Sequence, residues 1–265
     1  MGDPGQLAGW YRRHPRVLLG FSGGVDSAVL AVAGTRELAP GDFLAVIGRS
    51  ASFPEAQWSV ARELADRHQI EVLEVDTNEL ADPSYRANTP ERCYFCKKEL
   101  WAVLKRIADQ RGFETVVDGT HADDLGEHRP GARAGHEVGI RSPLVELGWG
   151  KRDVRAAARS LGLDVWEAPA SPCLASRVRY GLEVTPQRLG QVARAEAFIR
   201  SLGISGDLRV RHFGDSARIE VVPEMFPVID EKWPEVIDEM GRCGFAAVER
   251  DPRGYRRGSL LPIVG

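Results

Sequence analysis

The sequence is poor in lysine and cysteine and has no long apolar segment. Only five of its 35 basic residues are Lys, so Arg carries nearly all of the positive charge. The longest run without a charged side chain has nine residues, too few for a membrane-spanning helix. The first residues mix acidic and basic groups without an apolar stretch, unlike a secretory signal peptide. We therefore expect a cytoplasmic protein with no membrane partner.

The charge of the chain is nearly balanced. A net charge of −3 over 265 residues excludes a protein that binds nucleic acid through its whole surface, and no nucleic-acid partner is expected. The length suffices for one large α/β domain, or for a main domain with a small second one. In a reducing compartment, four cysteines favour metal binding or chemistry over structural disulfides.

Apolar strand patterns alternate with helical patterns over the first half of the chain. Strands are expected at 16–21, 43–48, 70–75 and 115–118, and helices at 25–37, 54–68, 97–112 and 151–162. Continuous apolar strands separated by helices predict an α/β fold, a parallel sheet with helices on both faces. The carboxyl ends of its strands are the expected ligand site. Residues 126–142, with four glycines and no periodicity, are expected to form a mobile surface loop.

The pattern changes after Arg177. We expect a strand at 180–184, a helix capped by Thr185, a hairpin of 208–213 and 217–222, a Pro-interrupted helix to about residue 241 and a strand near 245–249. This β-α-β-β-α-β order is typical of a small ferredoxin-like α+β domain. The sequence therefore predicts two domains, 1–176 and 177–265, with a loosely held tail after Arg250.

A glycine-rich hexapeptide, SGGVDS, joins the first expected strand to the first helix. Gly23 and Gly24 allow a sharp turn, after which backbone N–H groups at the helix start can face an anion. Ser22 and Ser27 add hydroxyl donors, and Asp26 would repel a phosphate unless Mg²⁺ lay between them. The loop lacks the Gly-Lys-Ser/Thr of a Walker A motif. In this context the hexapeptide favours a nucleotide phosphate site over an ordinary glycine turn.

SGGVDS resembles the PP-loop of the ATP pyrophosphatase superfamily, whose members adenylate a carboxylate or carbonyl oxygen and release pyrophosphate. The resemblance implies that Arg49, after the second strand, lies where such proteins hold adenine. It also implies that Thr120 and Asp123, in the segment DGTHADD, lie where ribose or a metal ion is bound. For Asp123 and Asp124, capping of a helix N-terminus is an equally good interpretation.

Three of the four cysteines stand in contexts that suggest chemistry. Cys93 and Cys96, in RCYFCK, precede a helix, and their spacing lets both sulfur atoms bind one metal ion or cluster, although a redox pair has the same spacing. Cys173 lies in the segment SPCLASR, where Arg177 is placed to activate the thiol or to hold a phosphate. A buried core thiol is the plain alternative for Cys173, and packing is the interpretation of Cys243.

SGGVDS, DGTHADD and SPCLASR, in this order over nearly the whole chain, together resemble the LarE family. The resemblance implies an ATP-dependent sulfurtransferase of nickel-pincer nucleotide biosynthesis. Such an enzyme adenylates a carboxylate of a pyridinium-3,5-dicarboxylate mononucleotide, releases pyrophosphate and forms a thiocarboxylate. The resemblance further implies ATP and Mg²⁺ as cofactors and a homo-oligomer.

The cysteines distinguish two kinds of LarE protein. Cys173 matches the cysteine that the family shares, and Cys93 and Cys96 match the pair added in members that hold a [4Fe–4S] cluster. The resemblance therefore implies that all three ligate a cluster that delivers sulfide. In the other kind, one cysteine gives up its own sulfur. A Zn²⁺ site of three Cys and one His has no obvious fourth ligand by spacing.

Two other functions stay open. One is a tRNA thiolase of the same superfamily, some of which also use three cysteines and an iron–sulfur cluster. The near-neutral charge and the absence of an obvious RNA-binding module weigh against it. The other is a non-catalytic protein that binds a nucleotide or carries a cluster.

Arginine is concentrated between residues 177 and 218, where eight Arg occur with four acidic residues. Arg209 and Arg211 alternate on one face of an expected strand, which suits the phosphate and carboxylates of a small ligand. A solvated charged strand face is nearly as good an interpretation. The resemblance implies that Arg209, Arg211 and Glu220 surround the sulfur-transfer site and that Arg177 steadies a phosphate, which assigns substrate binding and sulfur transfer to residues 177–265.

Overall fold

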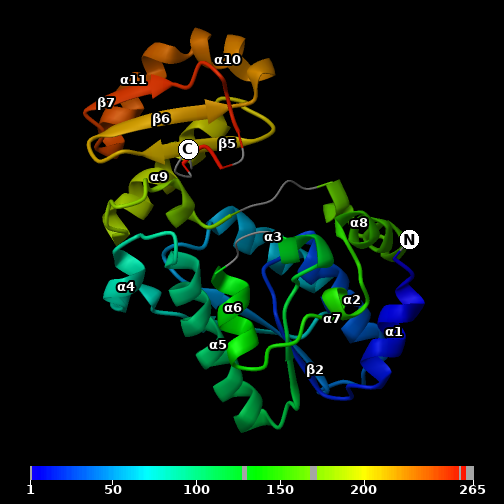
Figure 1. The fold of residues 1–265 in the computed structure, drawn as a ribbon. Helices are drawn as coiled ribbons and strands as arrows, with labels where there is room; N and C mark the ends of the chain where they lie inside the picture. Colours follow the sequence, from blue (N-terminus) through cyan, green and yellow to red (C-terminus); the bar gives the residue numbers. More distant parts are fainter. Residues whose placement is uncertain (1, 127–129, 168–171, 257, 261–265) are drawn as a thin grey trace. The chain divides into compact units, whose positions relative to one another are not determined.

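A computed structural model describes residues 2–126, 130–167, 172–256 and 258–260 (Figure 1). The chain divides into two compact units. The first comprises residues 1–79 and 91–171, and the second comprises residues 80–90 and 172–265. Within the described ranges, none of the helices combines the length and the apolar character that crossing a membrane requires.

The first unit is built on a four-stranded parallel sheet in the order β3-β2-β1-β4. Val17 of β1 pairs with Phe43 of β2 on one side and with Thr115 of β4 on the other. The expected α/β fold is thereby confirmed. The strands are β1 (Val17–Gly20), β2 (Phe43–Arg49), β3 (Val72–Asp76) and β4 (Thr115–Val117).

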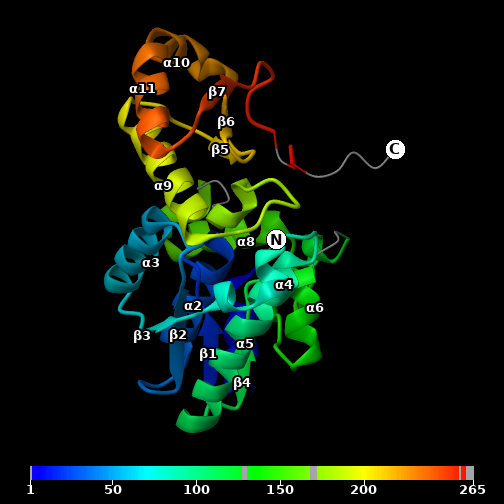
Figure 2. The same cartoon turned by 90° about the vertical axis from the view of Figure 1, so that its left-hand side faces the viewer.

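Helices cover both faces of this sheet because its strand residues are apolar on both faces (Figure 2). Val17 and Leu19 belong to a core shared with α1, α2, α3 and α8, whereas Leu18 belongs to a core shared with α5 and α6. The covering helices are α1 (Pro4–Arg12), α2 (Val25–Glu37), α3 (Glu55–Arg67), α5 (Arg92–Arg111), α6 (Pro130–Glu137) and α8 (Lys151–Leu161). Short helices connect them, namely η2 (Ala122–Gly126), α7 (Pro143–Glu146) and η3 (Asp164–Glu167). Helix η1 (Glu79–Ala81) begins at the last residue of the range 1–79, and α4 (Pro83–Arg86) lies in the segment 80–90 of the second unit.

Two expectations for the first unit were wrong. Helix α5 begins at Arg92, five residues before the expected start, since the segment from Arg92 to Lys97 contains no helix breaker. The expected loop at 126–142 contains helix α6, while residues 127–129 lie outside the described part. Helix α6 forms through tertiary contact: a Cβ on Gly135 would lie only 3.2 Å from Trp101 Nε1 of α5, so glycine permits the close packing.

The second unit has a three-stranded sheet in the order β5-β6-β7, with β5 antiparallel and β7 parallel to β6. Thr185 caps α9 as expected, because its Oγ1 accepts from the Arg188 amide at 3.2 Å. The elements are η4 (Leu174–Arg177), α9 (Pro186–Ser201), β5 (Leu208–His212), β6 (Ser216–Val221), η5 (Pro223–Met225), α10 (Phe226–Glu231), α11 (Trp233–Cys243) and β7 (Ala247–Arg250). Cys243 is buried in this core, in agreement with its expected packing role.

The expected ferredoxin-like order does not form. Residues 180–184 make a turn, with Gly181 at φ +83°, and the amides of Gly181 and Val184 donate to Asn88 and Arg86 of the segment 80–90. The expected Pro-interrupted helix is observed as α10 and α11, which are divided before Pro234, a residue without the N–H that a continuous helix would need.

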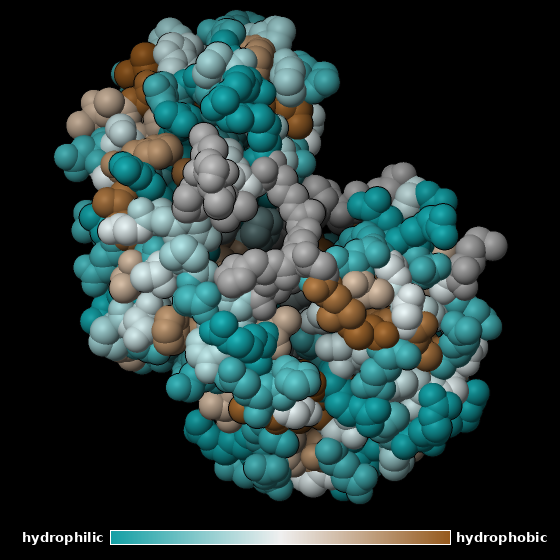
Figure 3. Space-filling model, viewed as in Figure 1, coloured by the Kyte–Doolittle hydropathy of each residue, from teal (hydrophilic) through white to brown (hydrophobic). Residues whose placement is uncertain are grey.

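The tail after Arg250 is held where the structure describes it, contrary to expectation. Asp251 is buried and accepts from the Arg253 amide, and the Tyr255 amide donates to Val221 at 2.8 Å. The large apolar residues that are exposed in the described ranges are scattered, and the face in Figure 3 is mostly hydrophilic.

Candidate functional site

The PP-loop turns sharply between β1 and α2. Gly23 has φ +72°, and a Cβ there would lie 2.7 Å from Ala61 Cβ on α3, so both the turn and the packing require glycine. The Ser22 and Ser27 hydroxyl groups lie 3.2 Å apart, and Ser27 Oγ donates to the Gly24 carbonyl at 3.0 Å. The serines therefore fix the loop before any ligand arrives.

The start of α2 presents donors to an anion. The amides of Val25, Asp26 and Ser27 are in the first turn, where no intrahelical acceptor exists, and they have no hydrogen-bond acceptor within the described ranges. Gly24 precedes them in extended conformation and has no capping side chain. The partial positive charge of the helix N-terminus adds to these amides.

This loop lies at the topological switch point of the sheet. The chain goes from β1 to β2 on one side, and β4 later adds to the other side of β1. Open α/β sheets bind their ligands at such a point, outside the carboxyl ends of the strands. A Cβ on Gly119, after β4, would lie 3.1 Å from the Ser27 amide, so the second loop closely approaches the first.

Asp26 is paired with a lysine. Lys151 Nζ, at the start of α8, donates to both carboxylate oxygens of Asp26 at 2.7 and 2.8 Å. His121, which is buried after β4, has its Nε2 atom 4.0 Å from Asp26 Oδ1 and 3.5 Å from Asp124 Oδ1. The His121 Nδ1 atom is buried and has no hydrogen-bond partner among the described residues.

Asp123 acts as a helix cap in this structure. Its Oδ2 atom accepts from the Lys151 amide at 2.7 Å, at the first residue of α8. Of the two interpretations of Asp123, the capping one is thus observed. Thr120 is also internally bonded, because its amide and hydroxyl both donate to Asp118. The described ranges contain no group of three potential ligands arranged to hold a metal ion.

Arg49, at the end of β2, lies among acids and an aromatic ring. Its guanidinium is 3.4 Å from Glu74 and 4.9 Å from the centre of the Trp58 ring. Nearby, the buried carboxylate of Glu79 accepts from the hydroxyl groups of Ser52 at 2.8 Å and Thr77 at 3.1 Å. These polar groups at the ends of β2 and β3 border the side of the sheet where adenine is expected.

The cysteines are divided between the two units. Cys93 is exposed and Cys96 is half-buried, and both lie in the first turns of α5, whereas the sequence placed them before the helix. Their three-residue spacing puts them on the same face of that helix. Cys173 belongs to the second unit and is the N-cap residue of η4.

Arg177 holds the backbone around Cys173. Its guanidinium is buried, makes two hydrogen bonds to Glu196 at 2.9 and 3.0 Å, and donates to the carbonyls of Pro172 and Cys173. Arg211 donates to the Ser176 carbonyl at 3.2 Å. Arg177 therefore holds the loop that carries Cys173, and its contact with a phosphate stays a prediction.

Arg209 and Arg211 of β5 are 5% and 6% exposed, which excludes the interpretation of a solvated strand face. Arg211 makes two bonds to the buried Glu220 of β6, at 2.9 and 2.8 Å. Burial and the nearby charge of Arg177 lower the pKa of Arg209. Arg177, Arg209 and Arg211 thus lie in a poorly solvated place, where the carboxylates of Glu196, Asp207 and Glu220 balance their charge.

Three residues of these sites were missed by the sequence reasoning. Lys151 and His121 contact Asp26 from distant parts of the sequence, and Glu196 pairs with Arg177 across 19 positions. For Lys151 the available signal was that lysine is rare in this chain, which sets each of its five lysines apart from the many arginines. For His121 the signal was its place within DGTHADD, whereas nothing distinguished Glu196 from other polar residues.

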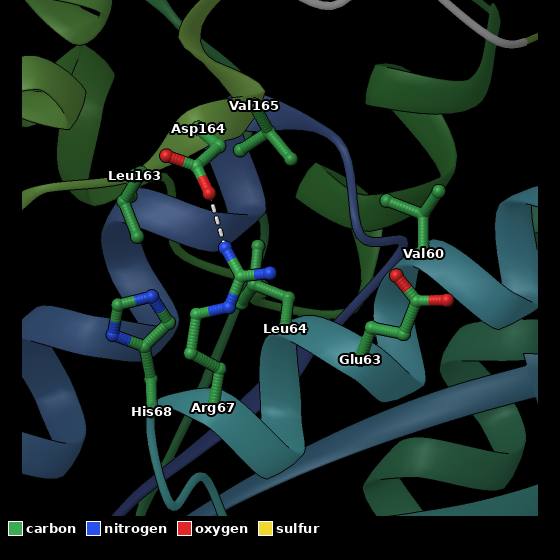
Figure 4. Close-up of a pocket in the computed structure, with 8 residues that line it drawn as sticks. All are labelled: Val60, Glu63, Leu64, Arg67, His68, Leu163, Asp164 and Val165. Atoms are coloured by element: carbon green, nitrogen blue, oxygen red, sulfur yellow. Dashed lines mark hydrogen bonds and ion pairs between the residues drawn. The ribbon is translucent and has the colours of Figure 1, made fainter.

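A separate cavity of about 420 Å³ lies between α3 and η3, lined by Val60, Glu63, Leu64, Arg67, His68, Leu163, Asp164 and Val165 (Figure 4). Arg67 and Asp164 form an ion pair in it. Burial lowers the pKa of His68, and the charges of Arg36 and Arg67 lower it further. No PP-loop residue lines this cavity, so it is not the candidate site.

Comparison with known proteins identifies the family. The NAD synthase family model matches residues 12–108, which include the PP-loop. The chain is 35% identical to pyridinium-3,5-bisthiocarboxylic acid mononucleotide synthase of Lactiplantibacillus plantarum over 92% of this chain and 88% of that protein. The chain belongs to the LarE family. LarE proteins are ATP-dependent sulfurtransferases of the PP-loop type.

Other relatives are similar to the chain in sequence. An uncharacterised protein of Synechocystis sp. is 40% identical to the chain over 94% of it and 93% of that protein. A glutamine-hydrolysing GMP synthase component from Archaeoglobus fulgidus is 26% identical over 74% of the chain and 73% of its own length. The LarE assignment confirms the resemblance drawn from SGGVDS, DGTHADD and SPCLASR.

Proposed function

We propose that this LarE protein adenylates a carboxylate of a pyridinium-3,5-dicarboxylate mononucleotide and converts it to a thiocarboxylate, in the biosynthesis of the nickel-pincer nucleotide. The observation that carries the proposal is the open PP-loop at the switch point, in a chain related to the Lactiplantibacillus synthase over most of its length. A carboxylate oxygen of the substrate attacks the α-phosphorus of ATP and pyrophosphate leaves. Sulfide then attacks the acyl carbon and AMP leaves.

The PP-loop supplies the groups that this first step needs. The amides of the first turn of α2, with Ser22 and Ser27, bind the phosphates that depart as pyrophosphate. Asp26 fits a Mg²⁺ ion that is shared with ATP, since Mg²⁺ is commonly held by one or two carboxylates together with substrate phosphates. The ion would neutralise charge on the leaving pyrophosphate.

The buried arginine cluster of the second unit suits the substrate. Arg211 is bonded to Glu220, and the guanidinium of Arg209 lies 3.6 Å from the Asp207 carboxylate. Burial lowers the pKa of Arg209, and a carboxylate or phosphate group of the substrate would offset that desolvation. We assign this cluster to the pyridinium mononucleotide. Arg177 positions Cys173 by binding the carbonyls of residues 172 and 173.

Cys93, Cys96 and Cys173 are proposed to hold a [4Fe–4S] cluster, which would supply sulfide to the acyl-adenylate. The two thiols on one face of α5 fit a shared cluster. The alternative is that Cys173 donates its own sulfur and becomes dehydroalanine. Iron content and chain mass after turnover decide between the two.

ATP–pyrophosphate exchange tests the proposed function. Exchange should require the pyridinium dicarboxylate mononucleotide, and tRNA should not replace it. Asp26→Asn should lose most of the exchange, whereas Lys232→Ala, a change at an exposed lysine of the second unit, should keep it. Exchange that depends on tRNA would favour a thiolase, and no exchange with either substrate would favour a non-catalytic protein.

A further inference from the structure

The arginine cluster of the second unit, Arg177, Arg209 and Arg211, is closed off from solvent. Each of these residues is at most 6% exposed, and Glu220 beside them is 1% exposed. Arg211 makes two bonds to Glu220, whereas the guanidinium of Arg209 lies 3.6 Å from the carboxylate of Asp207, the longest ion pair of the three. A ligand as large as a mononucleotide reaches such buried groups only after part of their cover has moved.

The chain after β7 supplies part of this cover. Its described residues, 251–256 and 258–260, form a strap that ends in contact with the cluster. The strap begins with a fixed turn, in which the buried Asp251 carboxylate accepts from the backbone amide two residues later at 2.8 Å. Gly254 has φ +68°, and a Cβ there would lie 2.7 Å from the carbonyl oxygen of Val221, so the turn requires glycine at this crossing. The turn thereby sets the position of the residue that follows it.

Tyr255 and Ser259 make the contacts between the strap and the cluster. The guanidinium of Arg209 lies 5.0 Å from the centre of the Tyr255 ring. Ser259 Oγ donates to Glu220 Oε1 at 2.6 Å, while Oε2 of the same carboxylate is bound by Arg211. Both strap residues are half-buried, so they lie between the buried cluster and the solvent. The strap therefore covers the arginine with the longest ion pair and occupies one oxygen of the carboxylate that anchors its neighbour.

An anion binds Arg209 more strongly than the strap does. A carboxylate or phosphate accepts from the N–H groups along the edge of a guanidinium, in hydrogen bonds that are charge-assisted and often paired. Stacking on the face of an aromatic ring gives a weaker attraction. The substrate assigned to this cluster carries both carboxylates and a phosphate, so it has the groups that could replace the strap.

We propose that the strap is a gate on the substrate site, and that Tyr255 and Ser259 hold it closed until the pyridinium mononucleotide displaces them. The proposal rests on the assignment of the arginine cluster to this substrate. The free energy that opens the strap is subtracted from the binding of the substrate, because only the open fraction of the protein is competent to bind it. A loosened strap should therefore expose Arg209 and raise the affinity for the mononucleotide.

Labelling with phenylglyoxal, which modifies accessible guanidinium groups, tests the closed state when the product is located by mass spectrometry. Labelling of a covered side chain follows the population of the open state when opening and closing are fast. Ser259→Ala removes a hydrogen bond to a charged group, so Arg209 should be labelled about ten-fold faster. Tyr255→Leu keeps apolar volume but loses the aromatic face, and should accelerate labelling about two- to five-fold. Unchanged labelling of Arg209 in both variants would overturn the proposal.

Two matched variants control for the loss of a ring or a hydroxyl elsewhere in the second unit. Phe213→Leu removes a ring that lies 4.9 Å from the Arg218 guanidinium, and Ser201→Ala removes a hydroxyl that donates to a carbonyl of α9. Both should leave the labelling of Arg209 at the wild-type rate. In the strap variants, hydrogen exchange of β5 and β6 should also stay at the wild-type rate. Loss of protection along these strands would attribute the faster labelling to a disrupted sheet and contradict the gate.

Calorimetry with the pyridinium mononucleotide tests whether the gate acts on the substrate. The double variant Tyr255→Leu/Ser259→Ala should bind the mononucleotide about ten-fold or more tightly than the wild type, and ATP equally well. Weaker binding of the mononucleotide would mean that the strap binds the substrate and does not compete with it, which would refute the proposal. If neither protein binds the mononucleotide, the proposed function is wrong, whereas the labelling of Arg209 still decides whether the strap closes the cluster.

Discussion

Breaking the Arg177–Glu196 ion pair should destabilise the second unit strongly. Arg177→Met keeps the length of the side chain but removes two bonds to Glu196 and two donations to the loop that carries Cys173. Arg177 is 3% exposed, so the variant leaves a largely buried Glu196 carboxylate without its cation. Removing one partner of such a pair costs about 3–5 kcal/mol in the free energy of unfolding.

Hydrogen exchange followed by mass spectrometry measures this effect locally. In Arg177→Met, peptides that cover residues 172–178 and β5 should lose protection, while the sheet of the first unit should keep it. Arg242→Met is the matched control, because the Arg242–Glu239 pair is exposed and worth at most about 1 kcal/mol. Equal losses in the two variants would refute the view that the buried pair holds the Cys173 loop.

Three further predictions concern the second unit and the cysteines. Burial lowers the pKa of His212 to about 4, so the unfolded chain binds more protons than the native chain as the pH falls from about 6.5 to 4. The free energy of unfolding should drop in that window by up to about 3 kcal/mol, and His212→Gln should remove most of this drop in urea titrations. Arg209→Ala should weaken the pyridinium mononucleotide about ten- to a hundred-fold and leave ATP unaffected, as judged by calorimetry; equal losses would contradict a substrate role. After anaerobic reconstitution, the iron content should fall in each of three variants, Cys93→Ala, Cys96→Ala and Cys173→Ala, while ATP–pyrophosphate exchange persists. If Cys93→Ala still forms the thiocarboxylate and its Cys173 becomes dehydroalanine, the cluster assignment is wrong.

The sheet of the first unit was predictable because its strands are mostly apolar runs separated by helical patterns. The PP-loop was also predictable, because the residues that form its turn and its phosphate donors are adjacent in the sequence. Helix α6 was missed because its formation depends on contact with Trp101, which local periodicity does not report. The turn at 180–184 was missed because its partners, Arg86 and Asn88, come from a segment some 90 residues earlier.

The sequence indicated which polar residues lie in the candidate site better than it indicated which partners they bind. The bonds of Arg177 to the Pro172 and Cys173 carbonyls and to Glu196 of α9 could not be predicted, because Glu196 lies 19 positions away in the sequence. Asp123 was equally good as a ligand or a cap until the start of α8 was placed beside it. Side-chain roles of this kind depend on pairs that are distant in the sequence, so composition and spacing alone leave them open.

Product stoichiometry tests the central claim most directly. The purified protein should be incubated anaerobically with ATP, Mg²⁺, sulfide and the pyridinium dicarboxylate mononucleotide, and the products separated by chromatography with mass detection. The account predicts one AMP and one pyrophosphate for each carboxylate oxygen replaced by sulfur. Formation of ADP and orthophosphate, or of AMP without a sulfur-containing product, would contradict it.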